Sequence, residues 1–155
     1  MNELTHINAQ GRAHMVDVSS KEITLRTATA SGKVVMSQAA FDLAYHNKKG
    51  DPIAIAELAG IMGAKKTSDL IPLCHPLPLS KVSVEITPLE NAIGYRVIAT
   101  TKTNGKTGVE MEALVAVTTA CLTVYDMLKA VDKGIEITDI KLENKSGGKS
   151  GDYTR

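Results

Sequence analysis

Cys74 and His75 are adjacent in a stretch that also holds Pro72, Pro76 and Pro78. Each proline fixes a backbone angle and removes an amide donor, so we expect a stiff extended loop that presents the two side chains. Adjacent residues on an extended chain point to opposite sides, and no other cysteine or paired histidine completes a zinc set, so no metal site is predicted. The rigid loop favours His75 as an acid, a base or a phosphate contact, against a plainer role as a cap on a backbone group.

A GKTG turn at residues 105–108 separates a predicted strand from a helical pattern over about residues 109–131. It is not a P-loop, because that motif needs a glycine five residues before Gly105, where Thr100 stands. A glycine-rich turn that leads into a helix still offers free amides and a positive dipole end to a phosphate. Asn104 and Gly105 are also an ordinary tight-turn dipeptide, so both interpretations remain open.

The predicted long helix carries acidic residues at its start and an acidic and basic pair near its end. Asp126 and Lys129 are three residues apart, which predicts either a surface ion pair or, in a closed site, a lysine whose proton affinity the carboxylate tunes. Glu112 lies 14 residues before Asp126, and at 1.5 Å per residue this places them about 21 Å apart along the axis. If both residues are functional, a site shared between two subunits of a symmetric oligomer is expected.

Composition excludes several classes of protein. The 155 residues are 43% hydrophobic and 23% charged, as expected for one soluble domain over residues 1–155. The balance of 18 basic and 17 acidic residues and an aromatic content of 3% argue against nucleic-acid binding. Two cysteines and no signal peptide or membrane span favour a reducing cytoplasm. Lysine pairs that fall in loops could converge on a polyphosphate, namely Lys48 and Lys49, Lys65 and Lys66, Lys102 and Lys106, and Lys145 and Lys149.

The first half of the chain shows strand and helix signals. Residues 22–29 and 33–36 predict a hairpin that turns at Ser31 and Gly32. Ser37 is expected to cap a short helix. Asp51 followed by a proline predicts the start of a second helix, whose small residues would let it lie close to a neighbour.

The second half predicts two paired strands at residues 82–87 and 95–103, then the long helix, which Gly134 is expected to end. The final strand, at residues 135–143, changes the parity of its apolar residues between Ile137 and Ile140, as a bulge would require. Together these elements predict an α+β two-layer sandwich with an antiparallel sheet packed against helices.

The two ends of the chain differ from the rest. Residues 1 to about 14 are polar and without periodicity, and we expect a flexible arm. Residues from about 144 to 155 are rich in Gly, Ser and Lys, and we expect a mobile tail that could fold over a ligand as a lid.

Several long strings resemble the cyclic pyranopterin monophosphate synthase family, called MoaC, of molybdenum cofactor biosynthesis. They are THINAQGRAHMVDVSSK, KKGD, ELAGIMGAKKTSDLIPLCHPLPLSKV, GKTGVEMEAL, LTVYDMLKAVDK and KSGGKSG, and together they cover nearly the whole chain. The resemblance implies a ferredoxin-like fold. It also implies a lyase that converts 3',8-cyclo-7,8-dihydro-GTP to cyclic pyranopterin monophosphate and diphosphate. The implied assembly is a hexamer, a trimer of dimers, with sites between subunits.

The resemblance also assigns site residues, position by position. Those implied to be catalytic are Asp126, Lys129, Lys49 and His75. Those implied to bind substrate are Leu73, Cys74, His75, Met111, Glu112 and Arg26. Glu110, at the start of the predicted helix, and the tail lysines Lys145 and Lys149 are expected to bind substrate as well. The departures from the family pattern fall in the hairpin before residue 37 and in the turn at residues 88–94, where no site residue lies.

General acid and base catalysis is the expected mechanism, with Lys129 as the principal proton-transfer group and Asp126 as the partner that orients it. No cofactor is required; a divalent cation such as Mg²⁺ is compatible with the reaction but is not indicated by the sequence. Two alternatives stay open: a module that senses a nucleotide triphosphate without chemistry, and a purely structural oligomer.

Overall fold

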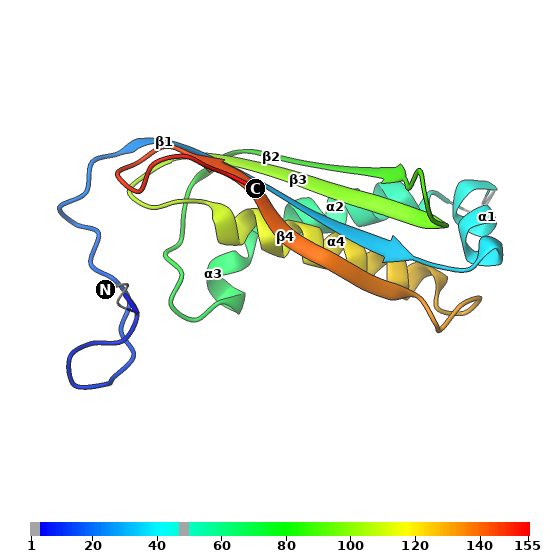
Figure 1. The fold of residues 1–155 in the computed structure, drawn as a ribbon, viewed down its shortest axis with the longest axis horizontal. Helices are drawn as coiled ribbons and strands as arrows, with labels where there is room; N and C mark the ends of the chain where they lie inside the picture. The colour runs from blue at the N-terminus through cyan, green and yellow to red at the C-terminus, as the bar shows by residue number, and fades with distance from the viewer. Residues whose placement is uncertain (1–3, 47–49) are drawn as a thin grey trace.

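The computed structural model describes residues 4–46 and 50–155. Its antiparallel sheet has the strand order β2-β3-β1-β4-β5. The strands are β1 (Thr24–Val35), β2 (Leu79–Pro88), β3 (Gly94–Gly105), β4 (Glu136–Ser146) and β5 (Tyr153–Thr154). Helices join β1 to β2 and β3 to β4 and pack on one face of the sheet (Figure 1). This is the β-α-β-β-α-β arrangement of ferredoxin-like folds, and the predicted α+β sandwich is confirmed.

The helices are α1 (Gln38–His46), α2 (Pro52–Lys65), α3 (Thr67–Leu70) and α4 (Glu110–Leu128). The Ser37 hydroxyl caps α1 by accepting from the amide of residue 40 at 3.3 Å. Asp51 caps α2, because one carboxylate oxygen accepts from the amides of residues 53 and 54 at 3.0 Å each. Both predicted helix starts are therefore confirmed. The short helix α3 was not predicted; it occupies the beginning of the stretch that was expected to be extended.

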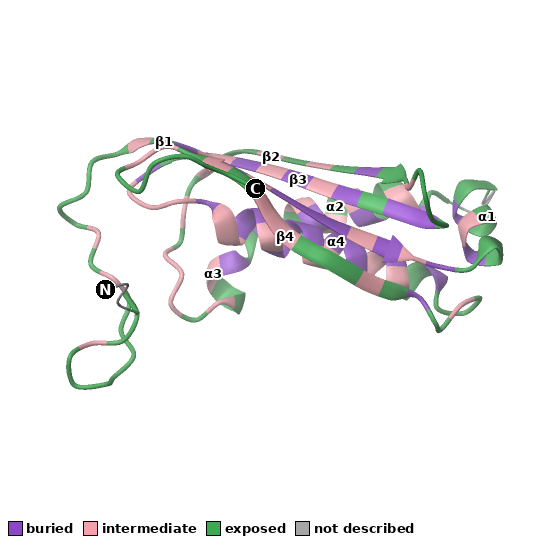
Figure 2. Cartoon of the chain, in the orientation of Figure 1, coloured by how far each residue is buried: buried purple, intermediate pink, exposed green. Residues whose placement is uncertain are grey.

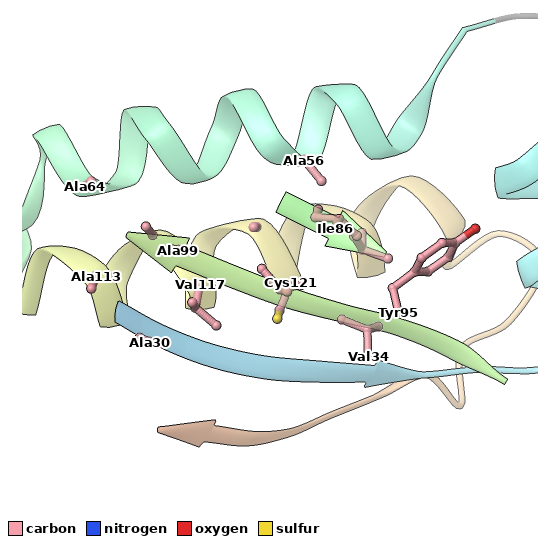
Figure 3. Close-up of a cluster of buried hydrophobic side chains, with 14 of the residues drawn as sticks. Ala30, Val34, Ala56, Ala64, Ile86, Tyr95, Ala99, Ala113, Val117 and Cys121 are labelled. Atoms are coloured by element: carbon pink, nitrogen blue, oxygen red, sulfur yellow. The ribbon is translucent and has the colours of Figure 1, made fainter. Parts of the chain in front are cut away.

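The core lies between the sheet and the two long helices. Figure 2 shows buried residues along the central strands and α4, and Figure 3 shows their side chains between α2, α4 and the sheet. A Cβ added at Gly60 of α2 would lie 2.9 Å from the Ala116 carbonyl oxygen of α4. A Cβ at Gly63 would lie 2.8 Å from Cβ of Thr119. The expectation that α2 uses small residues to approach a neighbour is confirmed, and that neighbour is α4.

The predicted hairpin with a turn at Ser31 and Gly32 is wrong. Both residues lie inside the continuous strand β1, which pairs with β3 on one side and β4 on the other. Gly32 faces α4, and a Cβ there would lie 2.8 Å from Cγ1 of Val117 and 3.2 Å from Cγ1 of Ile140. The glycine allows α4 to approach the sheet closely. In the sequence alone, a glycine after a serine between two strand patterns predicts a turn.

The end of α4 also differs from the prediction. The helix ends at Leu128, and Gly134 does not end it. The amides of Val131 and Asp132 both bond to the carbonyl of Leu128, which forms a separate turn after the helix. The predicted bulge in β4 is confirmed, since the register with β1 shifts between residues 31 and 33 and Asp139 adopts a φ of +55°.

The segment that leads into β1 and the turn between β4 and β5 lie at the same end of the sheet (Figure 1). Residues 4–23 form no named helix or strand; one isolated bridge joins Ile7 to Ala13. At the other terminus, β5 folds back onto β4 and pairs Tyr153 with Lys145. Residues 144–155 thus form a hairpin in the structure, and their mobility stays a prediction.

By length and composition alone, α4 is apolar enough to cross a membrane, which the sequence analysis did not expect. Its buried residues include Ala113, Val117, Cys121 and Val124, and they belong to the core cluster between the sheet and α2. A buried core helix meets the same criteria, so the composition of α4 is explained by its packing.

Replacing Gly32 with Ala is expected to lower the free energy of unfolding by about 1–3 kcal/mol, because the added methyl group overpacks the contact with the stiff side chain of Val117. Urea unfolding measures the change. Gly134→Ala is the matched control, since Gly134 is exposed and its added Cβ would meet only an Asp132 carboxylate oxygen. Equal stability of the two variants would show that the close contact is not required.

Candidate functional site

The proline-rich loop and the start of α4 enclose a small cavity of about 140 Å³, called here the loop cavity. Five of the residues expected in the site come together there. Two further residues that line it, Thr107 and Gly108, belong to the GKTG turn, and His6 reaches it from the N-terminal segment. The five are Leu73, Cys74, His75, Met111 and Glu112.

A second cavity, of about 430 Å³, shares Thr107 and Gly108 with the loop cavity and is called here the basic cavity. Three expected residues line it, Arg26, Glu110 and Lys149. The cations Lys21 and Lys106 line it as well, together with residues of the C-terminal hairpin. Lys145 contacts two residues that line the cavity: its Nζ lies 3.3 Å from Glu110 Oε1 and 2.8 Å from the Ser150 hydroxyl.

The N-cap residue of α4, Val109, makes no side-chain hydrogen bond to the first amides of the helix, whereas the Glu112 carboxyl accepts from its own amide. The GKTG turn therefore leads into a helix N-terminus whose N-cap side chain satisfies none of its donors, in keeping with one of the two open interpretations of this turn. These donors lie at the turn that borders both cavities. An anion in the basic cavity would meet the positive end of the α4 dipole as well as the lysines.

Arg26 has only 8% of its surface exposed. Its guanidinium donates to the carbonyls of Gly105, Lys106 and Gly147, each at 3.4 Å. A Cβ at Gly148 would lie 1.6 Å from Nη1 of Arg26, so only glycine, here at a φ of +83°, fits beside the guanidinium. Arg26 thus joins the GKTG turn to the C-terminal hairpin, and within the described residues no carboxylate neutralises its charge.

Glu112 is the buried acid of the site, with 4% of its surface exposed. Burial raises the pKa of the Glu112 carboxyl, and the nearby charge of Glu110 raises it further. Burial likewise raises the pKa of the Cys74 thiol, with a smaller contribution from Glu112. Cys74 is therefore a neutral thiol in the structure and a poor nucleophile, whereas Glu112 is a carboxyl that can retain its proton and donate it.

The pair Asp126 and Lys129 lies at the opposite end of α4. Lys129 Nζ is 2.5 Å from Asp126 Oδ1, and the side chains are 55% and 66% exposed respectively. The hydrogen bond to Asp126 and its negative charge raise the pKa of Lys129. Since α4 is continuous between Glu112 and Asp126, the structure keeps this pair away from both cavities, as the spacing predicted.

Sequence reasoning placed some residues well and missed others. Lys49 lies outside the described residues, so the structure does not place it. Lys21, Thr24 and His6 line the cavities but were not proposed as site residues. They lie in or next to an irregular segment without periodicity, and only a long-range contact brings them to the site.

A third cavity, of about 550 Å³, lies elsewhere, on the sheet beside the turn at residues 88–92. It holds no residue expected in the site. Its basic groups are already paired, Lys33 with Asp139 at 2.7 Å and Arg96 with Glu143 at 3.8 Å. No three His, Cys, Asp or Glu side chains cluster as a metal site in the described part of the chain.

The fold and cavities define an α+β protein of the ferredoxin-like class with an anion-attracting site at the start of its longest helix. A family model for the MoaC family matches residues 15–148, and the chain belongs to this family. It is 59% identical over 155 residues to a protein from Dinoroseobacter shibae, a match that covers 99% of this chain and 98% of that protein.

Two further relatives give the same result. A protein from Nostoc sp. is 57% identical, with 97% of this chain and 90% of that protein covered. A protein from Streptomyces avermitilis is 54% identical, with 99% and 91% covered. All three proteins are named cyclic pyranopterin monophosphate synthase.

Glu112→Gln is expected to stabilise the protein at pH 8 and to have no such effect below the ordinary carboxyl pKa of 4.5. Folding raises the pKa of Glu112, so the folded state binds more protons than the unfolded state as the pH rises from 4.5 to the raised value. The free energy of unfolding of the wild type therefore falls as the pH rises through this window. That of the Glu112→Gln variant does not, because glutamine does not titrate. Urea midpoints of both proteins, measured across this pH range, test whether the variant is the more stable protein at pH 8.

Glu136→Gln is the control for this prediction, because Glu136 is an exposed carboxylate at the start of β4 and has no part in raising the pKa of Glu112. It should give no stabilisation at pH 8. A Glu112→Gln variant that is less stable than the wild type at pH 8 would contradict the raised pKa of Glu112.

Proposed function

We propose that this chain is a cyclic pyranopterin monophosphate synthase of molybdenum cofactor biosynthesis. As a lyase it converts 3',8-cyclo-7,8-dihydro-GTP to cyclic pyranopterin monophosphate and diphosphate. The observation that carries the proposal is the convergence of Arg26, Lys106 and Lys149 on a cavity beside the buried Glu112, in a chain of the MoaC family. The basic cavity suits a triphosphate, and the loop cavity offers groups that exchange protons.

The proposed chemistry consists of proton transfers around ring opening, ring closure and formation of a cyclic phosphate. Lys129 serves as the principal acid and base, and Asp126 orients it. His75 and Glu112 bind the base or move further protons. Arg26, Lys145 and Lys149, with Lys49, hold the triphosphate and favour the departure of diphosphate.

No cofactor is required by these steps, since none of them transfers electrons to or from the protein. A divalent cation such as Mg²⁺ would assist at the phosphates and is not part of the proposal. The protein is proposed to act in the cytoplasm, where its two cysteines, Cys74 and Cys121, stay reduced; both are free thiols in the structure.

The active site is proposed to form between two subunits of a hexamer, arranged as a trimer of dimers. Two observations support a shared site. Lys129 and Asp126 cannot reach the loop cavity of their own chain, because a continuous helix separates them from Glu112. The outer faces of the helices also expose apolar side chains that a second copy could cover, which are Ile55, Leu58, Met62 and Leu122.

Lys129→Ala is expected to lower synthase activity by about 10²–10⁴-fold, the contribution of one general acid or base. The side chain is exposed in the chain and adds little to its stability, so the variant should fold and assemble. Product is followed by the fluorescence of the oxidised pyranopterin, formed from enzymatically made 3',8-cyclo-7,8-dihydro-GTP.

Lys133→Ala is the matched control, because this exposed lysine lies just beyond the same helix end and is not assigned to the site. Turnover by Lys129→Ala near that of the control would remove Lys129 from the mechanism. A wild-type protein that binds the substrate tightly and yields no product would instead favour the nucleotide-sensing module.

Mixed oligomers test the shared site directly. Glu112→Ala and Lys129→Ala should each be inactive alone, since every site contains one altered residue. Random mixing of the two chains should restore about a quarter of the wild-type activity, because half of the dimers are mixed and each mixed dimer holds one intact site. Activity is measured after co-expression with two tags and purification of the mixed species. Mixed oligomers that remain inactive would place Glu112 and Lys129 in the same chain's site or outside it.

A further inference from the structure

The side chain of His75 contacts the main chain of the N-terminal segment. Its Nε2 lies 2.8 Å from the carbonyl oxygen of Val16. A carbonyl oxygen can only accept a hydrogen bond, so Nε2 must carry a proton in this contact. A neutral imidazole has a single N–H, and its other nitrogen, Nδ1, is then an acceptor.

The segment that supplies this carbonyl, residues 15–19, is called here the strap. Its far end is fixed at the GKTG turn, where Lys106 Nζ donates to the Ser19 carbonyl at 2.8 Å. Val16 and Val18 are half-buried, whereas the residues around them are exposed. The Asp17 carboxylate accepts from the Ser19 amide at 2.8 Å, which shapes the turn between the two anchors. The strap thus joins two segments that border the loop cavity.

The loop on the other side of this contact is fixed as well. The Cys74 amide donates to the carbonyl of Ile71 at 3.1 Å. The Thr103 hydroxyl, on the buried side of β3, donates to the carbonyl of Pro78 at 2.6 Å. With Pro72 and Pro76 between these two contacts, the backbone that carries His75 has little freedom to move away from Val16.

We propose that the strap is a positioning element that holds His75 with its proton on Nε2, so that Nδ1 is presented as the proton acceptor. Val16 acts through its main-chain carbonyl, and the strap orients His75 before substrate binds. A role in turnover rests on the function proposed above, because His75 lines the loop cavity together with Glu112. In this arrangement the His75 imidazole accepts a proton, and the buried Glu112 carboxyl can donate one.

Nitrogen-15 NMR of histidine-labelled full-length protein at pH 8 tests the tautomer without substrate. The His75 resonances are assigned by their loss in His75→Gln. We expect a directly observable Nε2–H proton, protected by the bond to Val16, and an unprotonated Nδ1. An imidazole N–H of an unconstrained histidine exchanges with water too quickly to be observed. A proton found on Nδ1 would overturn the proposal.

Two shortened chains test the strap. A chain that begins at Met15 keeps Val16, and one that begins at Ser19 after a new initiator removes it. Since the hydrophobic core cluster begins at Ala28, both chains should fold, and circular dichroism checks this. The Nε2–H signal should persist in the first chain and vanish in the second. In the second chain we expect kcat to fall by about tenfold or more with a smaller change in KM, since the imidazole is no longer oriented. A signal that survives removal of the strap would overturn its positioning role.

A full-length pair of variants gives an independent readout. In His75→Gln the side-chain amide nitrogen can reach the place of Nε2 and still donate to Val16, whereas the shorter side chain of His75→Asn cannot. Hydrogen exchange across residues 15–21 should therefore be faster in the Asn variant than in the Gln variant. Equal exchange would contradict the contact. The NMR and hydrogen-exchange measurements use no substrate. If both give the expected result and the protein has no synthase activity, only the proposed function is rejected.

Discussion

The structure depends on the closeness with which α4 packs between the sheet and α2. Glycines stand where the surfaces meet, Gly32 under α4 and Gly60 and Gly63 against it, and a Cβ at any of these would lie within 3.0 Å of a neighbouring atom. The interior is packed so densely that α4 can take only one position between the sheet and α2. The packing of α4 fixes the position of both its ends, where Glu112 and the pair Asp126 and Lys129 lie.

The two ends of α4 have different electrostatic surroundings. The start of α4 attracts anions, because the positive end of the helix dipole lies there together with the buried charge of Arg26 and nearby lysines. Glu112 is buried in the same first turn, where the positive end of the dipole favours an acidic residue although burial opposes its ionisation. At the other end, Asp126 and Lys129 pair in solvent. The continuous helix α4 holds these two ends apart, so the single site proposed above has to include a second copy of the chain.

Local chemistry made some features predictable, and long-range packing hid others. The caps at Ser37 and Asp51 were predictable because a cap depends on residues two or three positions away. The role of Gly32 was not, since the reason for that glycine is Val117, on another element. The bond between His75 and Val16 spans 59 positions and ends on a main-chain atom, which leaves no trace in residue types. The prolines pointed to Cys74 and His75 and the family resemblance added Leu73, but the strap that contacts His75 could be found only from the coordinates.

In the proposed mechanism, the protonation state of Lys129 depends on the association of subunits. In the separate chain the contact with Asp126 raises the pKa of Lys129, so at neutral pH the lysine is an ammonium that can donate a proton but cannot accept one. Burial lowers the pKa of a lysine, because the charged form loses its hydration, and nearby cations lower it further. A subunit that covers the pair and brings it to a basic cavity would supply both effects. Under the proposed function, the exposed pair is one half of a proton-transfer site, and association with a second subunit would lower the pKa of Lys129 from its raised value in the single chain.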